Sequence, residues 1–223
     1  GIGLNPLRGI LPESEILSLV ENLQQEGALV NWKNNPDGTR SPYEINVTYL
    51  DALSLQDSSD EERIARFLLA HAVLLSFPGV PAVYIQSILG SRNDYEGVER
   101  LGYNRAINRK KYTAGQLGSE LNNKKSIRYQ IYSRLSEFIA IRRGERAFHP
   151  DSQAAFDAVG KQILKIIRVA ENGERITALF NFSNKMQTVY EQTLSGKELL
   201  SGQDISGTEL ILNPWQVMWI KEN

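Results

Sequence analysis

Three stretches of the sequence repeat apolar residues at the spacing of an amphipathic helix. The first begins after Pro12 and ends before Gly27, the second opens at Asp60, and the third closes on Arg142 and Arg143. Proline and acidic residues favour helix starts, whereas glycine and basic residues favour helix ends. We therefore predict helices over residues 12–26, from 60 up to Pro78 and Gly79, and over 126–143.

An unbroken apolar run covers Val80 to Ile85, between the predicted helix that opens at Asp60 and a polar loop that extends to Arg109. The run is rich in β-branched and aromatic residues and is entered through Pro78 and Gly79, which predicts a strand buried on both faces. A helix that leads directly into a buried strand is typical of folds that alternate strands and helices. In an α/β barrel the loop after such a strand carries ligand-binding groups.

Weaker patterns lie on either side of these elements. Residues 28–32 predict a strand, residues 34–44 concentrate turn formers and predict an exposed loop, and residues 45–53 predict an extended segment. After His149 and Pro150, short β-type runs alternate with Gly, Asn and Ser, which favours a small antiparallel sheet or sandwich and a domain boundary near 147–152. The runs are 162–169, 175–182, 187–190, 198–200, 209–212 and 215–220.

The composition excludes several classes of function but says little about the fold. The chain has 223 residues, 41% of them hydrophobic, which allows a sizeable core. Its net charge of -1 predicts no binding to nucleic acid or to an anionic membrane. No apolar run reaches the roughly 18 residues of a membrane span, and the first residues lack the features of a signal peptide. The chain has no cysteine, which excludes disulfides and thiolate chemistry and fits a cytoplasmic location.

We expect the two histidines and the tryptophans Trp215 and Trp219 to have structural roles rather than to bind a ligand. His71 on an apolar helix face and His149 before Pro150 do not have the spacing of a metal site, so we expect a core and a linker position. Trp215 and Trp219 alternate on one predicted strand face and are expected in the core rather than stacked on a sugar. We expect neither a metal nor an organic cofactor.

Four motifs, taken together, resemble a known family. They are GIGLNPLRGILP at 1–12, SPYEINVTYLDAL at 41–53, FPGVPAVYIQSILGSRND at 77–94 and NRAINR at 104–109. The sequence is similar to the α-amylase superfamily of glycoside-active enzymes, and more narrowly to its sucrose phosphorylase-like subfamily. Because the chain begins at Gly1, without an initiator Met and in what looks like the middle of a loop, we expect it to be part of something longer.

The resemblance implies a fold class and a domain layout. It implies an α/β protein: the C-terminal part of a (β/α)8 barrel with an inserted subdomain, followed by a small antiparallel all-β domain. Residues 1–55 would be an insertion after the seventh barrel strand, and residues 56–148 the last part of the barrel, with its eighth strand at 80–85. Residues 149–223 would be the C-terminal β-domain.

The resemblance also implies an activity that this chain cannot perform alone. A retaining enzyme of the family needs two carboxyl groups about 5 Å apart, and in the family these lie on earlier strands, so none of the matched positions corresponds to the catalytic pair. The intact enzyme would transfer a glucosyl unit from a small α-glucoside to inorganic phosphate. Its partners would be these two substrates and the missing N-terminal part of the barrel.

Two alternatives remain open at this point. One is a hydrolase or transglucosidase of the same superfamily, in which water or a sugar replaces phosphate. The other is a non-catalytic carbohydrate-binding module that is complete in this chain. A complete module predicts a strand at 80–85 that is fully paired within the chain, whereas a fragment predicts that this strand lacks at least one barrel neighbour.

Arg105 is the first candidate for substrate binding. In the family the matching arginine reaches hydroxyl groups of the bound glucosyl unit, and a guanidinium offers forked donors suited to neighbouring oxygens. The alternative is a structural arginine paired with Asp94 or Glu96. Asn93 and Asp94 are expected to shape the same pocket, although such residues after a strand commonly make turns.

Tyr43 and Glu44 match a mobile loop of the sucrose phosphorylases. By that resemblance Tyr43 would offer its hydroxyl to phosphate and Glu44 would face the leaving group, whereas the alternative is an ordinary turn. Sucrose phosphorylases carry Asp and Gln where this chain has Ser41 and Glu44. The leaving group therefore stays open between fructose, a sugar phosphate, glycerol and glycerate. The basic segment 100–111 could help collect phosphate, with Lys110 and Lys111 on a solvated face.

Overall fold

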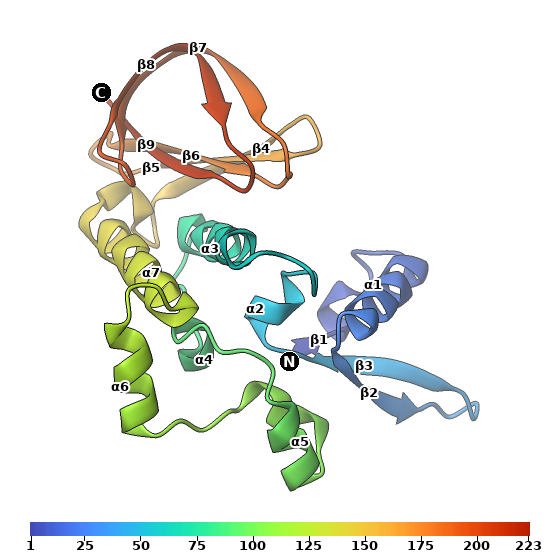
Figure 1. Ribbon diagram of the computed structural model, residues 1–223. Helices are drawn as coiled ribbons and strands as arrows, with labels where there is room; N and C mark the ends of the chain where they lie inside the picture. Colours follow the sequence, from blue (N-terminus) through green and yellow to red (C-terminus); the bar gives the residue numbers. More distant parts are fainter. The chain divides into compact units, whose positions relative to one another are not determined.

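The computed structural model describes residues 1–191 and 194–223, which form two compact units. The N-terminal unit comprises Gly1–Arg63 and Val83–Tyr132, and the C-terminal unit comprises Ile64–Ala82 and Ser133–Asn223. Each unit holds one antiparallel sheet (Figure 1). The predicted layout of 1–55, 56–148 and 149–223 stays a prediction, since it refers to barrel strands outside this chain.

The sheet of the N-terminal unit has three strands with helix α1 (Glu13–Gln25) packed on one face. The central strand β3 (Arg40–Asn46) pairs with β1 (Ile2–Gly3) on one side and with β2 (Leu29–Asn34) on the other. Apolar residues of α1 and of the strands bury one another because their periods place them on facing surfaces. These residues include Ile16, Val20, Leu23, Val30 and Ile45.

The structure confirms part of the pattern in the first fifty residues. The helix at 12–26 and the strand at 28–32 correspond to α1 and β2. The loop predicted over 34–44 is wrong, because β3 begins at Arg40 and only a short turn separates it from β2. The extended segment predicted over 45–53 is wrong beyond Asn46, because the Thr48 hydroxyl accepts a hydrogen bond from the amide of Asp51 and caps helix α2 (Tyr49–Ala52).

The sequence pattern did not predict several short helices. A helix of one or two turns is too short to show a helical period, so its apolar residues carry little signal. In α6, however, Thr113 and Gln116 form a capping box that the sequence does display. The short elements are η1 (Asn5–Leu7), α4 (Ile85–Ile88), α5 (Tyr95–Leu101), η2 (Asn104–Asn108), α6 (Ala114–Asn122) and η3 (Arg146–Phe148).

The two longest predicted helices are confirmed as α3 (Asp60–Ser76) and α7 (Ile127–Gly144). His71 of α3 is buried, as expected, and its Nδ1 lies 2.9 Å from the carbonyl oxygen of Phe67. Burial lowers the pKa of His71, although the contact with the Phe67 carbonyl opposes the shift. Among the described residues, no helix combines the length and the apolar character that crossing a membrane requires.

The strand predicted at 80–85 is wrong for this chain. Residues 80–84 pair with no described strand, and α4 begins at Ile85. Val80 is 84% exposed and Ile85 is 56% exposed, so the expected burial on both faces is also absent. A strand forms only where neighbouring strands satisfy its backbone groups. The unpaired segment agrees with the expectation that 80–85 lacks a barrel neighbour in this chain, and it counts against a complete module.

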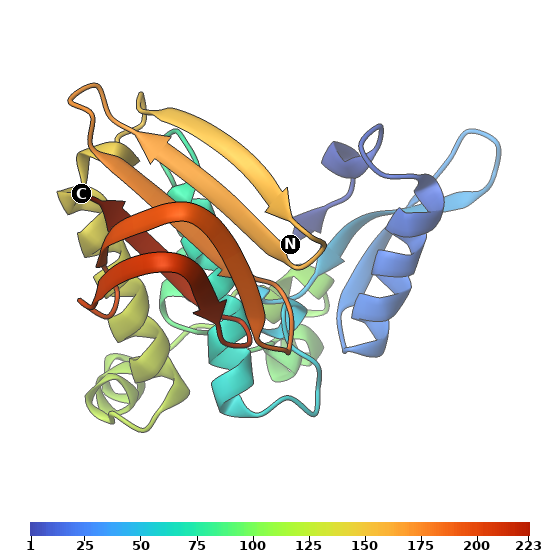
Figure 2. The same cartoon turned by 90° about the horizontal axis from the view of Figure 1, so that it is seen from above.

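The C-terminal unit carries a six-stranded antiparallel sheet in the order β4-β5-β6-β9-β7-β8. Figure 2 shows how strongly β7 and β8 bend. Apolar residues from β5 to β9 form its core, among them Ile163, Leu179, Val189, Leu212 and Ile220. The strands are β4 (Gln153–Val159), β5 (Ile163–Val169), β6 (Arg175–Asn181), β7 (Gln187–Glu198), β8 (Asp204–Leu212) and β9 (Val217–Glu222).

The predicted β-type runs correspond to most of this sheet. The runs at 162–169, 175–182, 209–212 and 215–220 overlap β5, β6, β8 and β9. The run at 187–190 lies in β7, whereas the run at 198–200 overlaps β7 only at its last residue, Glu198, and is wrong beyond it. Trp219 is fully buried, as expected. The expectation for Trp215 is wrong: it precedes β9 with a φ of 57°, and the guanidinium carbon of Arg66 lies 4.7 Å from the centre of its ring.

Candidate functional site

The structure brings together two residues that the motifs single out, Glu44 and Arg105. Glu44 lies on the central strand β3, and Arg105 lies in η2, which contacts β2 and β3. The Nε of Arg105 donates a hydrogen bond to Oε2 of Glu44 at 2.9 Å. The Glu44 side chain is 16% exposed and that of Arg105 is 48% exposed, so the pair opens to solvent on the arginine side. The arginine does have a carboxylate partner, but it is Glu44 rather than Asp94 or Glu96.

Two asparagines complete a hydrogen-bonded chain around this pair. Nδ2 of Asn31, on β2, donates to the same Oε2 of Glu44 at 2.9 Å. Asn104 in turn donates from Nδ2 to Oδ1 of Asn31 at 2.9 Å and to the carbonyl of Val30 at 3.3 Å. The chain therefore runs Asn104–Asn31–Glu44–Arg105 and ties η2 to the sheet. The NRAINR motif contains Asn104, whereas nothing in the sequence around Asn31 distinguishes it from a surface residue.

Glu44 and Arg105 each stabilise the charged form of the other, as their pKa shifts show. Burial alone raises the pKa of Glu44, but the hydrogen bonds from Arg105 and Asn31 and the charge of Arg105 outweigh it and hold that pKa below its ordinary value. The hydrogen bond to Glu44 and its negative charge likewise raise the pKa of Arg105. Glu44 is therefore ionised at neutral pH and acts only as a hydrogen-bond acceptor.

Tyr43 occupies a β-bulge rather than a loop or an ordinary turn. Asn31 pairs with Glu44 and Trp32 pairs with Pro42, which leaves Tyr43 as the extra residue of β3. Pro42 has no N–H to give to a ladder, and the short strand β1 pairs with β3 only at Glu44 and Ile45. A bulge re-aims the side chain at its centre and is frequent beside active sites. The backbone thus sets the direction of Tyr43 independently of the alternation along β3.

Asn93 and Asp94 contact the protein rather than the Glu44–Arg105 pair. Oδ1 of Asn93 accepts a hydrogen bond from the amide of Thr48 at 2.8 Å. Asp94 precedes α5, is buried, and lies 3.8 Å from Nζ of Lys110. Gly97 lies directly against the Asp94 carboxylate, so a side chain added there would have to displace it. These contacts are those of residues that order a turn, which was the alternative for both positions.

A pocket of about 290 Å³ in the N-terminal unit lies next to this pair, since its lining includes Gly1, where a Cβ would lie 2.8 Å from Oε1 of Glu44, and Asn108, which shares η2 with Arg105. Its lining includes Thr48, Tyr49, Tyr84, Gln86 and Asn108, but none of the five predicted site residues lines it. The candidate site is the half-exposed Glu44–Arg105 surface, with this pocket beside it. No group of three or more His, Asp or Glu residues in the described part of the chain is placed to hold a metal ion.

Solved structures identify the class of fold. The crystal structure of sucrose 6F-phosphate phosphorylase from Thermoanaerobacter thermosaccharolyticum matches with a TM-score of 0.69 and 21% sequence identity, over 93% of this chain and 39% of that chain. The chain thus has a mixed α/β fold of the α-amylase type, with an antiparallel sheet. No family model matches the sequence.

Sequence relatives identify the group within that class. Glucosylglycerate phosphorylase of Escherichia coli (strain K12) is 64% identical over 99% of this chain and 40% of the relative. The protein of that name from Allomeiothermus silvanus is 37% identical over 99% of this chain and 38% of the relative. Sucrose phosphorylase of Streptococcus mutans serotype c is 28% identical over 87% of this chain and 39% of the relative.

The chain matches the C-terminal part of the sucrose phosphorylase-like members of the α-amylase superfamily. It spans about 40% of the length of the curated relatives it matches. The resemblance inferred from the motifs is confirmed. None of these comparisons tests the roles predicted for Arg105, Tyr43, Glu44, Asn93 and Asp94, which stay predictions.

Proposed function

We propose that this chain is part of a retaining α-glucoside phosphorylase that transfers a glucosyl unit from glucosylglycerate to inorganic phosphate. The relatives at 64%, 37% and 32% identity over 99% of this chain all carry the name glucosylglycerate phosphorylase. The sucrose phosphorylase is less similar, at 28% identity. This ranking favours glycerate among the leaving groups that the motifs left open.

The observation that carries the proposal is the geometry of Arg105. In the part of the chain that the structure describes, its guanidinium is bonded through Nε to Glu44, and its two Nη groups make no hydrogen bond to the protein. A guanidinium fixed at one edge presents its remaining donors in a defined direction. Such donors suit neighbouring hydroxyl oxygens of a glucosyl unit or the carboxylate of a glycerate group.

The ionised state of Glu44 bears on the leaving group. A carboxylate held in its charged form accepts hydrogen bonds from hydroxyl groups and repels an anionic group, whether a phosphate or the carboxylate of glycerate, that comes close without a cation beside it. Glycerate offers a hydroxyl beside its carboxylate, and the positive charge of Arg105 lies against the same Glu44 oxygen. In the proposed site Glu44 bonds the hydroxyl, Arg105 holds the glucosyl unit, and Tyr43 offers its hydroxyl to phosphate.

The bond-making carboxylates lie outside this chain in the proposal. One carboxylate attacks the anomeric carbon and forms a covalent glucosyl ester, while the second carboxyl group protonates the departing glycerate oxygen. A phosphate oxygen then attacks the same carbon, its proton passes to the second carboxylate, and the ester bond breaks. The product is α-glucose 1-phosphate, with retained configuration. The chain alone is inactive in this account.

The unpaired segment 80–84 supports the domain layout that goes with this proposal, in which this chain is the C-terminal part of a barrel enzyme. Residues 80–85 would become the eighth strand of a (β/α)8 barrel whose earlier strands belong to the N-terminal part of the protein. Residues 1–55 would be an inserted subdomain, 56–148 the end of the barrel, and 149–223 the β-domain. A cytoplasmic location stays a prediction from composition.

A substrate panel tests the leaving group. The full-length protein would be incubated with phosphate and, separately, with glucosylglycerate, glucosylglycerol, sucrose and sucrose 6F-phosphate, and glucose 1-phosphate would be measured. The proposal expects kcat/KM to be highest with glucosylglycerate. A preference for sucrose or for the phosphorylated sugar would contradict the assignment of glycerate but would leave the phosphorylase class intact.

A further inference from the structure

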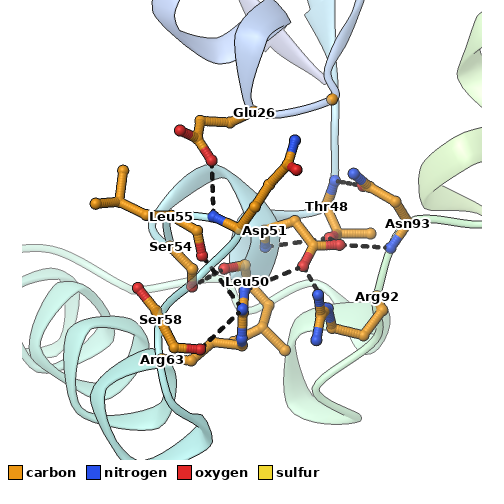
Figure 3. A network of polar contacts seen from close by, with 12 residues as sticks. Glu26, Thr48, Leu50, Asp51, Ser54, Leu55, Ser58, Arg63, Arg92 and Asn93 are labelled. Atoms are coloured by element: carbon orange, nitrogen blue, oxygen red, sulfur yellow. Dashed lines mark hydrogen bonds and ion pairs between the residues drawn. The ribbon is translucent and has the colours of Figure 1, made fainter.

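A buried carboxylate, Asp51, joins three segments of the N-terminal unit (Figure 3). It accepts hydrogen bonds from the amide of Asn93 at 2.7 Å, from the Thr48 hydroxyl at 3.1 Å and from Nε of Arg92. Nη1 of Arg63, at the start of α3, lies 3.7 Å from the same carboxylate. Asp51 therefore connects α2, α3 and the loop that begins at Ser91 through a single side chain.

The charges explain why this position holds a carboxylate. The Arg63 side chain is 5% exposed, and burial lowers the pKa of Arg63, although the charge of Asp51 opposes the shift. Arg63 also donates from Nη2 to the carbonyls of Leu55 and Ser58. A buried guanidinium needs a negative partner nearby. Asp51 supplies that charge and at the same time fixes the amide of Asn93.

From Asn93 the contacts lead to both members of the candidate site. Oδ1 of Asn93 accepts from the amide of Thr48, two residues after the end of β3, which carries Glu44. The next amide, that of Asp94, donates to the carbonyl of Ile107 at 2.8 Å, within η2, which carries Arg105. Asn93, which is bonded to Asp51, is thus bonded to the segment that follows Glu44, and its neighbour Asp94 is bonded to the segment that carries Arg105.

We propose that Asp51, acting through Asn93, is a positioning residue that sets the placement of Arg105 relative to Glu44. This inference rests on the proposed function, since it concerns the same site. Asp51 touches neither Glu44 nor Arg105, so its effect on glucosyl transfer passes through the loop. A small displacement of a substrate-holding group can lower the rate about 100-fold.

A double-mutant cycle in the full-length protein tests the inference. Asp51→Asn keeps the size of the side chain and removes its charge, and we expect it to lower kcat/KM for glucosyl transfer about 10- to 100-fold. In an Arg105→Ala background the same change is expected to lower kcat/KM by less than about twofold, because the group that it positions is gone. Asp57→Asn, in an exposed carboxylate nearby, is the matched control and is expected to stay within about twofold.

The thermal midpoint separates positioning from stability. If Asp51→Asn lowers the thermal midpoint, we expect the same lowering with and without Arg105. The loss of kcat/KM, by contrast, is expected to be much larger when Arg105 is present. Equal losses of activity in both backgrounds would overturn the inference. If Asp51→Asn does not fold, Asn93→Ala decides in the same cycle, because Asn93 is half-buried and loses only its side-chain bonds. Absence of phosphorolysis in the wild type would instead overturn the proposed function, and the cycle would then be measured on glucoside hydrolysis.

Discussion

Arg105 and Glu44 lie 61 residues apart in the sequence, and the Nε of the arginine is 2.9 Å from the Oε2 of the glutamate. One residue comes from the central strand of a small sheet and the other from a 3₁₀ turn that lies against it. The contact orients a half-exposed guanidinium toward solvent. The proposed function depends on this orientation.

Replacing Arg105 tests its role in holding the glucosyl unit. Arg105→Ala removes several charge-assisted donors, so kcat/KM of the full-length protein is expected to fall about 100-fold or more. Arg105→Lys is expected to recover only part, because an ammonium does not reproduce the fork of donors. Arg143→Ala, in an exposed arginine of α7, is the control. If Arg105→Ala retains more than half of the wild-type kcat/KM, the proposed role of Arg105 in holding the glucosyl unit is contradicted.

The pKa of Glu44 gives a prediction for acid stability. Because hydrogen bonds and the charge of Arg105 hold that pKa below the ordinary value of 4.5, the stabilisation is fully present above about pH 4.5 and is lost as the pH falls through the folded pKa. Glu44→Gln removes this titration, so its thermal midpoint is expected to fall less steeply between pH 5 and pH 3 than that of the wild type. Parallel curves would contradict the ion pair.

Buried His71 predicts a second pH effect at higher pH. Burial lowers its pKa from the ordinary 6.5, so the unfolded chain takes up a proton first as the pH falls below about 6.5, and the folded state loses stability there. We expect the thermal midpoint of His71→Leu to change less than that of the wild type between pH 7.5 and 5.5.

Gly196 tests the close packing of the C-terminal sheet. A Cβ at this position would lie 2.1 Å from the carbonyl oxygen of Lys221 on the neighbouring strand β9, so Gly196→Ala forces β7 and β9 apart. We expect a loss of about 2 kcal/mol or more in unfolding free energy. Gly118→Ala, in α6 with no atom near the new methyl group, is expected to be neutral or slightly stabilising. Equal thermal midpoints for both variants would contradict the register of β7 and β9.

The sequence predicts elements where the local pattern decides the structure. Long helices such as α3 and α7 follow from periodicity, because their apolar faces repeat over four or more turns. Strand β4 was missed because its small and acidic residues, Ala154, Ala155 and Asp157, carry little β signal in an edge strand. The segment at 80–85 was wrongly predicted as buried because a pattern of apolar residues does not tell whether its neighbours are present.

The candidate site, too, could be predicted from the sequence only in part. The motifs point to Arg105 and Glu44 individually, but their pairing depends on how η2 meets the sheet, which no local pattern encodes. Asn31 has no sequence signal at all, and its role follows only from the hydrogen bond to Glu44. Asp51 lies within the SPYEINVTYLDAL motif, yet its importance appears only when Arg63 and Asn93 are seen beside it.

Phosphate dependence of the full-length protein tests the central claim most directly. Glucosylglycerate would be supplied with and without inorganic phosphate, and the product would be identified by its anomeric configuration. The account predicts α-glucose 1-phosphate and glycerate in equal amounts, formed only when phosphate is present. Release of free glucose at a rate independent of phosphate would contradict it and assign the protein to the hydrolases of the superfamily.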